Sequence, residues 1–152
     1  MASEKSVAAE IEAVRQKGPQ RVLVCGGRDF TDKGVIVRAL APYKPVPWNA
    51  VSEHIVIHGG CPTGADKLAD EWCAVYGVRK RVYLADWSKH GRAAGPIRNQ
   101  RMIDEGRPDL VLAFPGGRGT ADMVRRASAA GIEVREIAAI APNSTEGRTD
   151  RG

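Results

Sequence analysis

The stretch LVLAFPGGRGT at residues 110–120 decides the fold of this chain, because an apolar strand stops abruptly in a glycine-rich turn that opens a helix. Without Cβ atoms, the backbone at Gly116, Gly117 and Gly119 can adopt positive φ and approach a ligand closely. The free N–H groups and the dipole of the helix that follows favour an anion at the same point. The stretch therefore predicts a strand, a phosphate-binding turn and a helix, in that order.

Two earlier stretches repeat the pattern. RVLVCGGRDF at residues 21–30 and HIVIHGGCPTGAD at residues 54–66 each carry a short apolar strand into a Gly-Gly pair. In a parallel sheet such turns lie at the carboxyl ends of the strands, where open α/β sheets bind their ligands. The alternative is three tight turns without a ligand, but turns alone do not require the polar side chains found in them. These are Arg28, Thr63, Asp66, Arg118 and Thr120.

Strands and helices alternate along the chain. We expect strands at residues 21–25, 55–58, 81–84, 110–114 and 133–137. The helices expected after the first four of them cover residues 33–40, 65–76, 96–105 and 120–130. This order predicts an α/β fold, a single Rossmann-like, doubly wound domain with a mainly parallel sheet of about five strands and helices on both faces.

The two ends of the chain differ from this core. Val7, Ile11 and Val14 recur at helical spacing, which predicts an amphipathic helix that packs on the sheet or serves a partner chain. The last residues are polar and small, which predicts a flexible tail. The expected division is an N-terminal helix, a Rossmann-like domain and a tail, at residues 1–18, 19–141 and 142–152. We expect a homo-oligomer, a dimer or higher.

Two connections lack helical patterns. Residues 42–48 contain three prolines and predict an extended loop. Residues 88–92 precede the helix expected at 96–105 and are bracketed by Gly91 and Gly95. That bracketing predicts either a mobile flap or an ordinary solvated loop.

Composition restricts the class of protein. With 152 residues, of which 43% are hydrophobic, the chain suits one domain with its own core. Its apolar runs fall short of the roughly 20 residues that a membrane span needs, and its start lacks a signal peptide, so we expect a cytoplasmic protein without membrane contact. Cys25, Cys61 and Cys73 match no metal-ligand spacing and predict neither a disulfide framework nor a metal site. No cofactor is expected.

The formal charge of +5 suits either nucleic acid or a small phosphorylated ligand. The basic residues are scattered and form no block, so nucleic acid is not favoured as the partner. Several of them fall in or near the predicted crevice, where a small nucleotide-like molecule would use them. These are Arg28, Lys89, Arg92, Arg98, Arg101 and Arg118.

Residues 86–102, DWSKHGRAAGPIRNQRM, form the densest cluster of reactive side chains. Pro96 suits the first turn of a helix, which places Arg98 and Asn99 near its positive end. A planar guanidinium there fits a phosphate or carboxylate, whereas the structural alternative is an ion pair with Asp104 or a neighbouring loop.

Single residues near the turns allow two interpretations each. His58 either titrates near a ligand or packs against the sheet edge. Trp87 either stacks on a base or belongs to the core, which is the more usual role at a strand end. For Asp66 we prefer an interaction with the helix dipole over a role as general base, and the same holds for Asp29 and Asp122.

The motifs GGRDF, HGGCPTGAD, ADWSKHGRAAGPIRNQRM and PDLVLAFPGGRGTADM, in this order, resemble the YspA branch, related to YpsA, of the SLOG superfamily of Rossmann-like domains. The resemblance covers roughly residues 21–137. It implies a nucleotide-derived ligand. Relatives in the superfamily include LOG-type phosphoribohydrolases, the DNA-binding protein DprA and sensor domains tied to NAD or ADP-ribose derivatives.

The chain departs from the LOG-type pattern P-G-G-x-G-T-x-x-E, because Met123 stands where those enzymes place their catalytic Glu. Asp122 comes one residue early, and a rotation of about 100° per residue is expected to take its carboxylate off the substrate side. By this resemblance, Arg98 matches the catalytic Arg of those enzymes. Glycosidic cleavage would therefore have to recruit another carboxylate, from the group Asp29, Asp66, Asp86 and Asp122.

The sequence thus predicts a protein that binds a nucleotide or nucleotide-derived molecule as sensor or carrier. The alternatives are a nucleotide N-glycosidic hydrolase, with Arg98 and Asp122 as candidate catalytic residues, and a DprA-like nucleic-acid binder. The expected ligand-binding residues are Gly26, Gly27, Arg28, Asp29, Gly59, Gly60, Thr63, Gly64, Asp66, Arg98, Asn99, Pro115, Gly116, Gly117, Arg118, Gly119 and Thr120.

Overall fold

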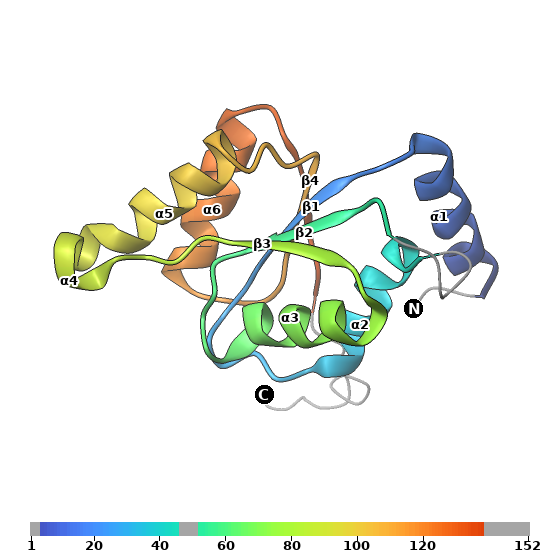
Figure 1. The fold of residues 1–152 in the computed structure, drawn as a ribbon, viewed down its shortest axis with the longest axis horizontal. Helices are drawn as coiled ribbons and strands as arrows, with labels where there is room; N and C mark the ends of the chain where they lie inside the picture. Colours follow the sequence, from blue (N-terminus) through green and yellow to red (C-terminus); the bar gives the residue numbers. More distant parts are fainter. Residues whose placement is uncertain (1–3, 46–51, 139–152) are drawn as a thin grey trace, which may run out of the picture.

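The computed structural model describes residues 4–45 and 52–138, which form a parallel sheet of five strands with helices on both faces (Figure 1). The strand order is β3-β2-β1-β4-β5. This confirms the predicted Rossmann-like α/β fold. The strands are β1 (Arg21–Cys25), β2 (Ile55–His58), β3 (Arg79–Val82), β4 (Leu110–Ala113) and β5 (Glu133–Glu136).

Within residues 4–45 and 52–138, six α-helices and two short 3₁₀ helices connect and flank the strands. The α-helices are α1 (Glu4–Lys17), α2 (Lys33–Leu40), α3 (Gly64–Tyr76), α4 (Trp87–His90), α5 (Ala94–Asp104) and α6 (Arg118–Ala129). The 3₁₀ helices are η1 (Ala41–Tyr43) and η2 (Gly91–Ala93). Helices α5 and α6 begin two residues earlier than the sequence predicts, because a first turn tolerates the glycine and proline that disfavour helix interiors.

Alternate residues of the central strand β1 enter two separate apolar layers. Val22 and Val24 are fully buried beneath α2 and α3, whereas Leu23 and Cys25 face α5 and α6 on the other side. Side chains on a strand point to opposite faces in turn, so a strand covered on both sides must be apolar throughout. This double burial fixes β1 and β4 in the centre and leaves the ends of these strands as the rigid base of the turns.

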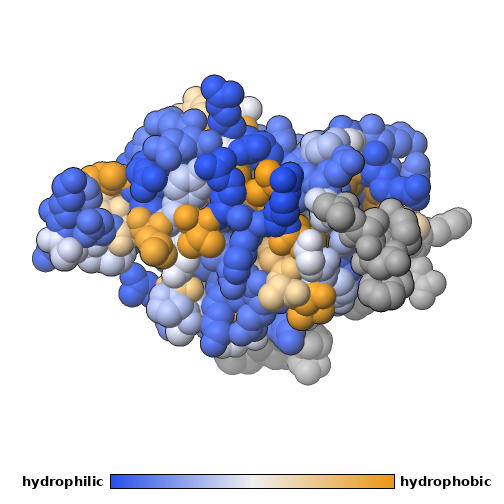
Figure 2. Space-filling view, in the orientation of Figure 1, coloured by the Kyte–Doolittle hydropathy of each residue, from blue (hydrophilic) through white to orange (hydrophobic). Residues whose placement is uncertain are grey.

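The two edge strands are exposed. All four side chains of β3 are accessible to solvent, and Figure 2 shows a mainly hydrophilic surface with separate apolar groups on the face where β3 lies in front. The bounds predicted for this strand, residues 81–84, are wrong by two residues, since pairing with β2 runs from Arg79 to Val82. Hydropathy did not predict the correct bounds of β3, because backbone pairing with β2 and not burial of its side chains determines where this strand lies.

Helix α1 stands at one end of the molecule and packs against η1 (Figure 1). Val14 is buried in the core layer beneath α2 and α3, and Ile11 is half-buried. The expected extended loop at residues 42–48 is wrong at its start, because Pro42 occupies the first turn of η1, where its missing N–H costs nothing. The rest of that loop beyond residue 45 and the tail at residues 142–152 lie outside the described residues.

The segment expected to be a flap or solvated loop at residues 88–92 is helical. The Asp86 carboxylate accepts a hydrogen bond from the Lys89 backbone N–H at 3.1 Å and so caps α4. Capping of this kind was not recognised from the sequence, and η2 continues the turn into α5. In the described part of the chain, no helix combines the length and apolarity needed to cross a membrane.

Candidate functional site

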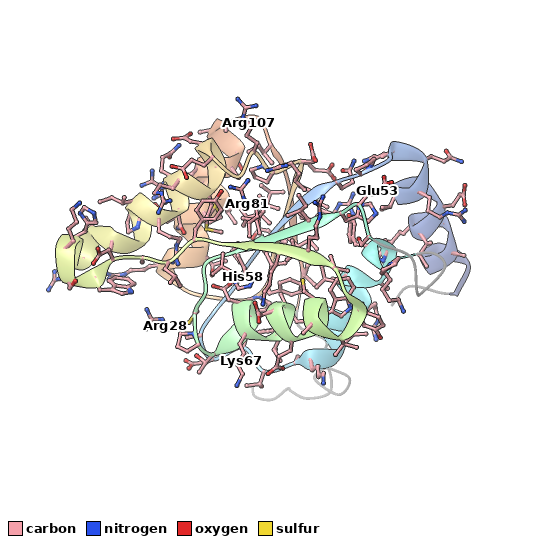
Figure 3. The ribbon with its side chains drawn as sticks, in the orientation of Figure 1. Arg28, Glu53, His58, Lys67, Arg81 and Arg107 are labelled. Atoms are coloured by element: carbon pink, nitrogen blue, oxygen red, sulfur yellow. The ribbon has the colours of Figure 1, made fainter. Side chains whose placement is uncertain are left out.

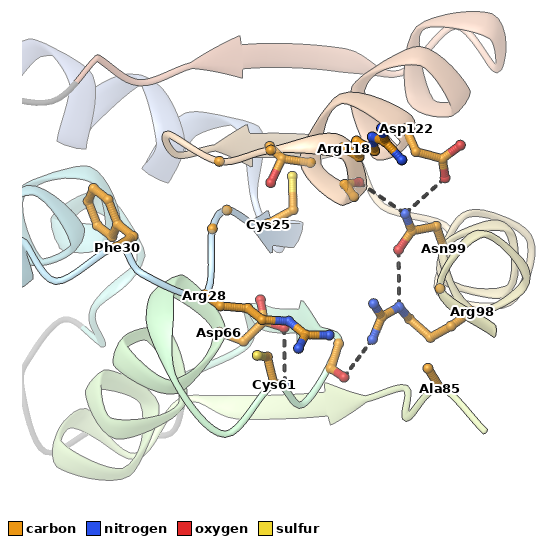
Figure 4. A pocket seen from close by; sticks show the side chains of 18 of the residues that line it. Cys25, Arg28, Phe30, Cys61, Asp66, Ala85, Arg98, Asn99, Arg118 and Asp122 are labelled. Carbon is orange, nitrogen blue, oxygen red and sulfur yellow. Dashed lines mark hydrogen bonds between the residues drawn. The ribbon is translucent and has the colours of Figure 1, made fainter. Parts of the chain in front are cut away.

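A cavity of about 1600 Å³ opens at the carboxyl ends of the strands (Figure 4). The turns after β1, β2, β3 and β4 surround it, together with the first turns of α5 and α6. Strand order reverses between β1 and β4, which is where open α/β sheets form ligand crevices. The cavity is larger than most pockets for small ligands, so it accommodates a molecule of nucleotide size.

Most of the ligand-binding and catalytic residues expected from the sequence line this cavity. They are Gly26, Gly27, Arg28, Asp29, Gly59, Gly60, Asp66, Arg98, Asn99, Pro115, Gly116, Gly117, Arg118, Gly119, Thr120 and Asp122.

Thr63 and Gly64 are the two expected ligand-binding residues that do not line the cavity. Thr63 is the N-cap of α3 but makes no capping hydrogen bond with its side chain. Gly64 has a φ of +78°, and a Cβ there would collide with the backbone of Gly27 and Arg28. The glycine therefore lets the start of α3 pack against the turn after β1.

The glycines of the first and last turns have different roles. The Gly27 N–H donates to the Pro115 carbonyl at 2.8 Å, and a Cβ on Gly116 would lie 2.6 Å from the Gly27 nitrogen. These two glycines thus bring the turns after β1 and β4 into contact. A Cβ on Gly117 or Gly119 would meet nothing within 4 Å. Packing therefore does not explain the latter two glycines, and they leave the cavity surface open.

The expectation of positive φ at Gly116, Gly117 and Gly119 is wrong. Among the glycines that line the cavity, Gly60, in the loop after β2, is the one with positive φ. The turn after β4 is shaped instead by the close contact of its backbone with Gly27. No side chain caps the start of α6, so its first N–H groups stay available at the cavity.

A chain of hydrogen bonds crosses one wall of the cavity (Figure 4). The Arg98 guanidinium donates from Nη1 to the Gly59 carbonyl at 2.8 Å and from Nε to Asn99 Oδ1 at 3.0 Å. Asn99 in turn donates from Nδ2 to the Gly119 carbonyl at 3.2 Å and to Asp122 Oδ2 at 3.0 Å. The chain connects the turn after β2 with α5 and α6, so it fixes the geometry of the site.

Asp122 lies at the end of this chain. It receives hydrogen bonds from Arg125 and Arg126, each at 2.7 Å. Burial acts to raise the pKa of Asp122, but the hydrogen bonds from Arg126 and Asn99 and the charges of both arginines hold it below its usual value. Asp122 is therefore an ionised carboxylate that is already paired.

The orientations expected for Asp122 and Met123 are wrong, because the structure reverses them. Asp122 lines the cavity, whereas Met123 is fully buried in the apolar layer formed with α5. The helix begins at Arg118, and its amphipathic face places Met123 over the sheet. A carboxylate at position 123 would thus enter the core of this protein.

Asp66 has the opposite electrostatic environment to Asp122. It is 8% exposed, lines the cavity, and accepts a hydrogen bond from the Cys61 N–H at 3.2 Å. Burial raises the pKa of Asp66 above its usual value, against the lowering effects of the Cys61 N–H and of His58 and Arg98. A carboxyl whose pKa is shifted towards neutrality is suited to exchange a proton with a ligand.

Gly59 lets Asp66 and Arg98 approach each other. A Cβ on Gly59 would overlap the Arg98 guanidinium and lie 3.1 Å from Asp66 Oδ2. Burial lowers the pKa of Arg98 while the Asp66 charge raises it, and the guanidinium remains a cation in either case. The cavity thus holds a buried carboxyl group next to a half-buried guanidinium cation, which is a group that recognises anions.

Cys25 forms part of the cavity floor. Burial, with smaller contributions from the Asp66 and Glu136 charges, raises the pKa of its thiol to about 12. The thiol is therefore protonated at neutral pH and is not a nucleophile. Across residues 4–45 and 52–138, no group of His, Cys, Asp and Glu side chains is arranged to hold a metal ion.

His58 holds the turn after β2 from behind (Figure 3). Its Nδ1 accepts a hydrogen bond from the Gly60 N–H at 3.0 Å, so Nε2 carries the proton and donates to Asp70 at 2.9 Å. Lys80 completes the group by pairing with Asp70. His58 is buried and does not line the cavity, so it positions the turn and does not contact a ligand there.

Several residues of the cavity wall were not assigned to it from the sequence. Arg125 was missed, although its position three residues after Asp122 on the same helix is the signal that relates them. Leu84, after β3, and Pro96, in the first turn of α5, were missed as well. Arg92 lines the cavity as expected. The preference for Trp87 in the core is wrong, because its side chain is half-exposed and lines the cavity.

The fold and the cavity define a Rossmann-like protein with a ligand crevice at the switch point of its sheet. A model of the YspA, cpYpsA-related SLOG family matches residues 20–90. The gene 61 protein of Mycobacterium phage D29 is 39% identical over 123 residues, which cover 76% of this chain and 94% of the phage protein. The chain belongs to the YspA, cpYpsA-related SLOG family, as its motifs indicate. Membership in this family suggests a nucleotide-related function.

Proposed function

We propose that the protein binds a nucleotide or nucleotide-derived small molecule in the cavity, as a sensor or carrier. The ligand is a nucleoside phosphate, ADP-ribose or an NAD-like compound. The observation that carries this proposal is the convergence of the open turn after β4 with several guanidinium groups on one cavity. Those guanidinium groups belong to Arg28, Arg92, Arg98, Arg118 and Arg125.

The phosphate is best placed at the start of α6. Gly117 and Gly119 leave room for close approach, and the uncapped N–H groups of the helix supply donors. Arg118 lies at the same helix end, and Arg98 faces the cavity from α5. Within the described residues, neither arginine forms an ion pair with a carboxylate, so both are available to an anionic ligand.

Thermal unfolding tests the binding proposal. Binding to the folded state alone raises the melting temperature, so AMP, ADP-ribose and NAD at millimolar concentration are the ligands to compare. Gly117→Val is expected to abolish the shift by blocking the turn, while Gly34→Val, an exposed glycine outside the cavity, should retain it. Circular dichroism verifies that both variants are folded. An unmoved transition with the whole panel would refute the proposal.

A second candidate function is N-glycosidic hydrolysis of a nucleotide. The one observation that favours it is the environment of Asp66. Its buried carboxyl beside Arg98 is the residue of the cavity suited to proton transfer, since Asp122 is paired, Asp29 is exposed and Asp86 caps α4. The sensor or carrier proposal expects AMP to be recovered intact after incubation. Adenine release that is lost in both Asp66→Asn and Arg98→Ala would establish the hydrolase instead.

A further inference from the structure

Trp87 presents an accessible aromatic surface at the cavity. It begins α4, lines the cavity wall and is 50% exposed. Trp72, by contrast, is 4% exposed within the core. A large aromatic side chain that remains half-exposed at a cavity provides a surface on which a flat ligand can stack.

The indole is held in position from two sides. Asp86 fixes the backbone of α4 by accepting hydrogen bonds from the Lys89 N–H and from the Ser88 hydroxyl at 2.9 Å. Gly95, at the start of α5, lies against the ring, since a Cβ there would be 3.4 Å from its Cη2 atom. The ring is thus supported before any ligand arrives, which reduces the entropy lost on binding.

Arg28 covers the ring from a distant part of the chain. Its guanidinium carbon lies 5.8 Å from the centre of the Trp87 ring, within the range of a cation–π contact. The arginine comes from the turn after β1 and lies on the side of the molecule that carries α4 (Figure 3). In the described part of the chain it pairs with no carboxylate, so it can move to admit a flat group over the indole.

The surroundings of Trp87 differ from those of the turn after β4. Leu84, 66% exposed, and Pro96 line the cavity on the same segment as Trp87. One part of the cavity therefore offers apolar and aromatic surface, while the start of α6 offers backbone donors and charge. A nucleotide has the matching division into a base and a phosphate.

From this arrangement we infer that Trp87 and Arg28 form a subsite for the aromatic base of the ligand. The base stacks on the indole, and the Arg28 guanidinium covers the opposite face of the base. The inference rests on the proposed function and specifies its ligand class, which is phosphorylated compounds that carry a flat heteroaromatic ring. Stacking accepts any base, so the subsite selects nucleotides over sugar phosphates.

The experiment compares AMP with ribose 5-phosphate, which lacks the base, by titration calorimetry. Wild type should bind AMP about 10- to 100-fold more tightly, the range that stacking of one base contributes. Trp87→Ala should reduce AMP affinity to that of ribose 5-phosphate and leave ribose 5-phosphate binding unchanged. Trp87→Phe should retain most of the AMP affinity because it keeps an aromatic face, and Arg28→Ala should weaken AMP binding.

Tryptophan fluorescence provides a second readout that does not depend on the alanine variant folding. AMP should change the fluorescence of wild type but not of Trp87→Phe, and ribose 5-phosphate should change neither. Equal affinity of wild type for AMP and ribose 5-phosphate would overturn the base subsite and leave the phosphate site standing. Wild-type AMP affinity in folded Trp87→Ala would also overturn it. Failure of both ligands to bind would instead refute the proposed function.

Discussion

Asn99 on α5 donates a hydrogen bond to Asp122 on α6 at 3.0 Å, and this contact joins the two helices that border the cavity. Asn99 also accepts from Arg98 and is 5% exposed, so both neighbours depend on it. A buried amide in this position serves the site and the fold together.

Asn99→Ala should lower the free energy of unfolding by about 1–3 kcal/mol, because it leaves buried partners without their hydrogen bonds. Urea denaturation measures this change. Gln100→Ala on the same helix is the matched control, since its side chain bonds only to partly exposed neighbours, Asp104 and Arg126. Equal stability of Asn99→Ala and Gln100→Ala would contradict the structural role of Asn99.

The contribution of Asp66 to the free energy of unfolding should fall as pH rises. A carboxylate whose pKa is lowered in the folded state has the opposite effect. The pKa of Asp66 is higher in the folded than in the unfolded state, so the folded protein holds the proton more tightly. Its contribution to stability is complete below the usual carboxyl pKa and is lost as pH rises through the raised value.

The measurement is urea unfolding of wild type and Asp66→Asn between pH 4 and neutrality. Asparagine keeps an oxygen that can accept from the Cys61 N–H but does not titrate. The stability of wild type relative to the variant should fall as pH rises. A difference that stays constant or rises with pH would show that the Asp66 pKa is not raised.

Met123→Glu should destabilise the protein by about 3 kcal/mol or more, because it places a carboxylate in a fully buried apolar layer. The same substitution is therefore expected to impair the fold and not to supply a catalytic carboxylate to the cavity. Met123→Leu, which preserves volume and polarity, should cost less than about 1.5 kcal/mol. Stability of Met123→Glu equal to that of Met123→Leu, measured by urea unfolding, would place position 123 outside the core.

Arg98→Ala should weaken nucleotide binding by about 1.5–3 kcal/mol, the range for a hydrogen bond to a charged group. Lysine should restore only part of the loss, because it lacks the planar fork. Calorimetry with AMP measures the effect, and Arg101→Ala on the solvent side of α5 is the control, since Arg101 pairs with Glu105. Wild-type affinity in Arg98→Ala would remove this arginine from the phosphate site.

The sequence predicted the fold well where burial on both faces leaves a clear pattern. Strands β1 and β2 and helix α2 begin and end at the expected residues, because apolar runs and glycine turns mark them. Strand β3 was displaced by two residues, since an exposed edge strand carries no apolar signal. The segment expected to be a loop or flap is helical, because local hydrogen bonds such as the Asp86 cap of α4 stabilise it.

The residues around the cavity were predictable as a group, because parallel strands bring their carboxyl ends together. Their individual orientations were not. Counting residues along α6 placed Asp122 away from the substrate side, but the packing of α6 buries Met123 in the layer over the sheet and turns Asp122 to the cavity. The separate roles of Gly116, which packs, and Gly117, which does not, likewise depend on neighbours from β1 that no local pattern reveals.

The most direct test of nucleotide binding is the ¹H–¹⁵N correlation spectrum of the labelled protein titrated with AMP, ADP-ribose and NAD. Binding as proposed predicts saturable shifts of the backbone N–H signals at the start of α6, from Gly117 to Ala121, and in the turn after β1. Signals of the distant α1 should stay in place. The absence of shifts with every ligand at millimolar concentration, or shifts confined to surfaces outside the cavity, would contradict the account.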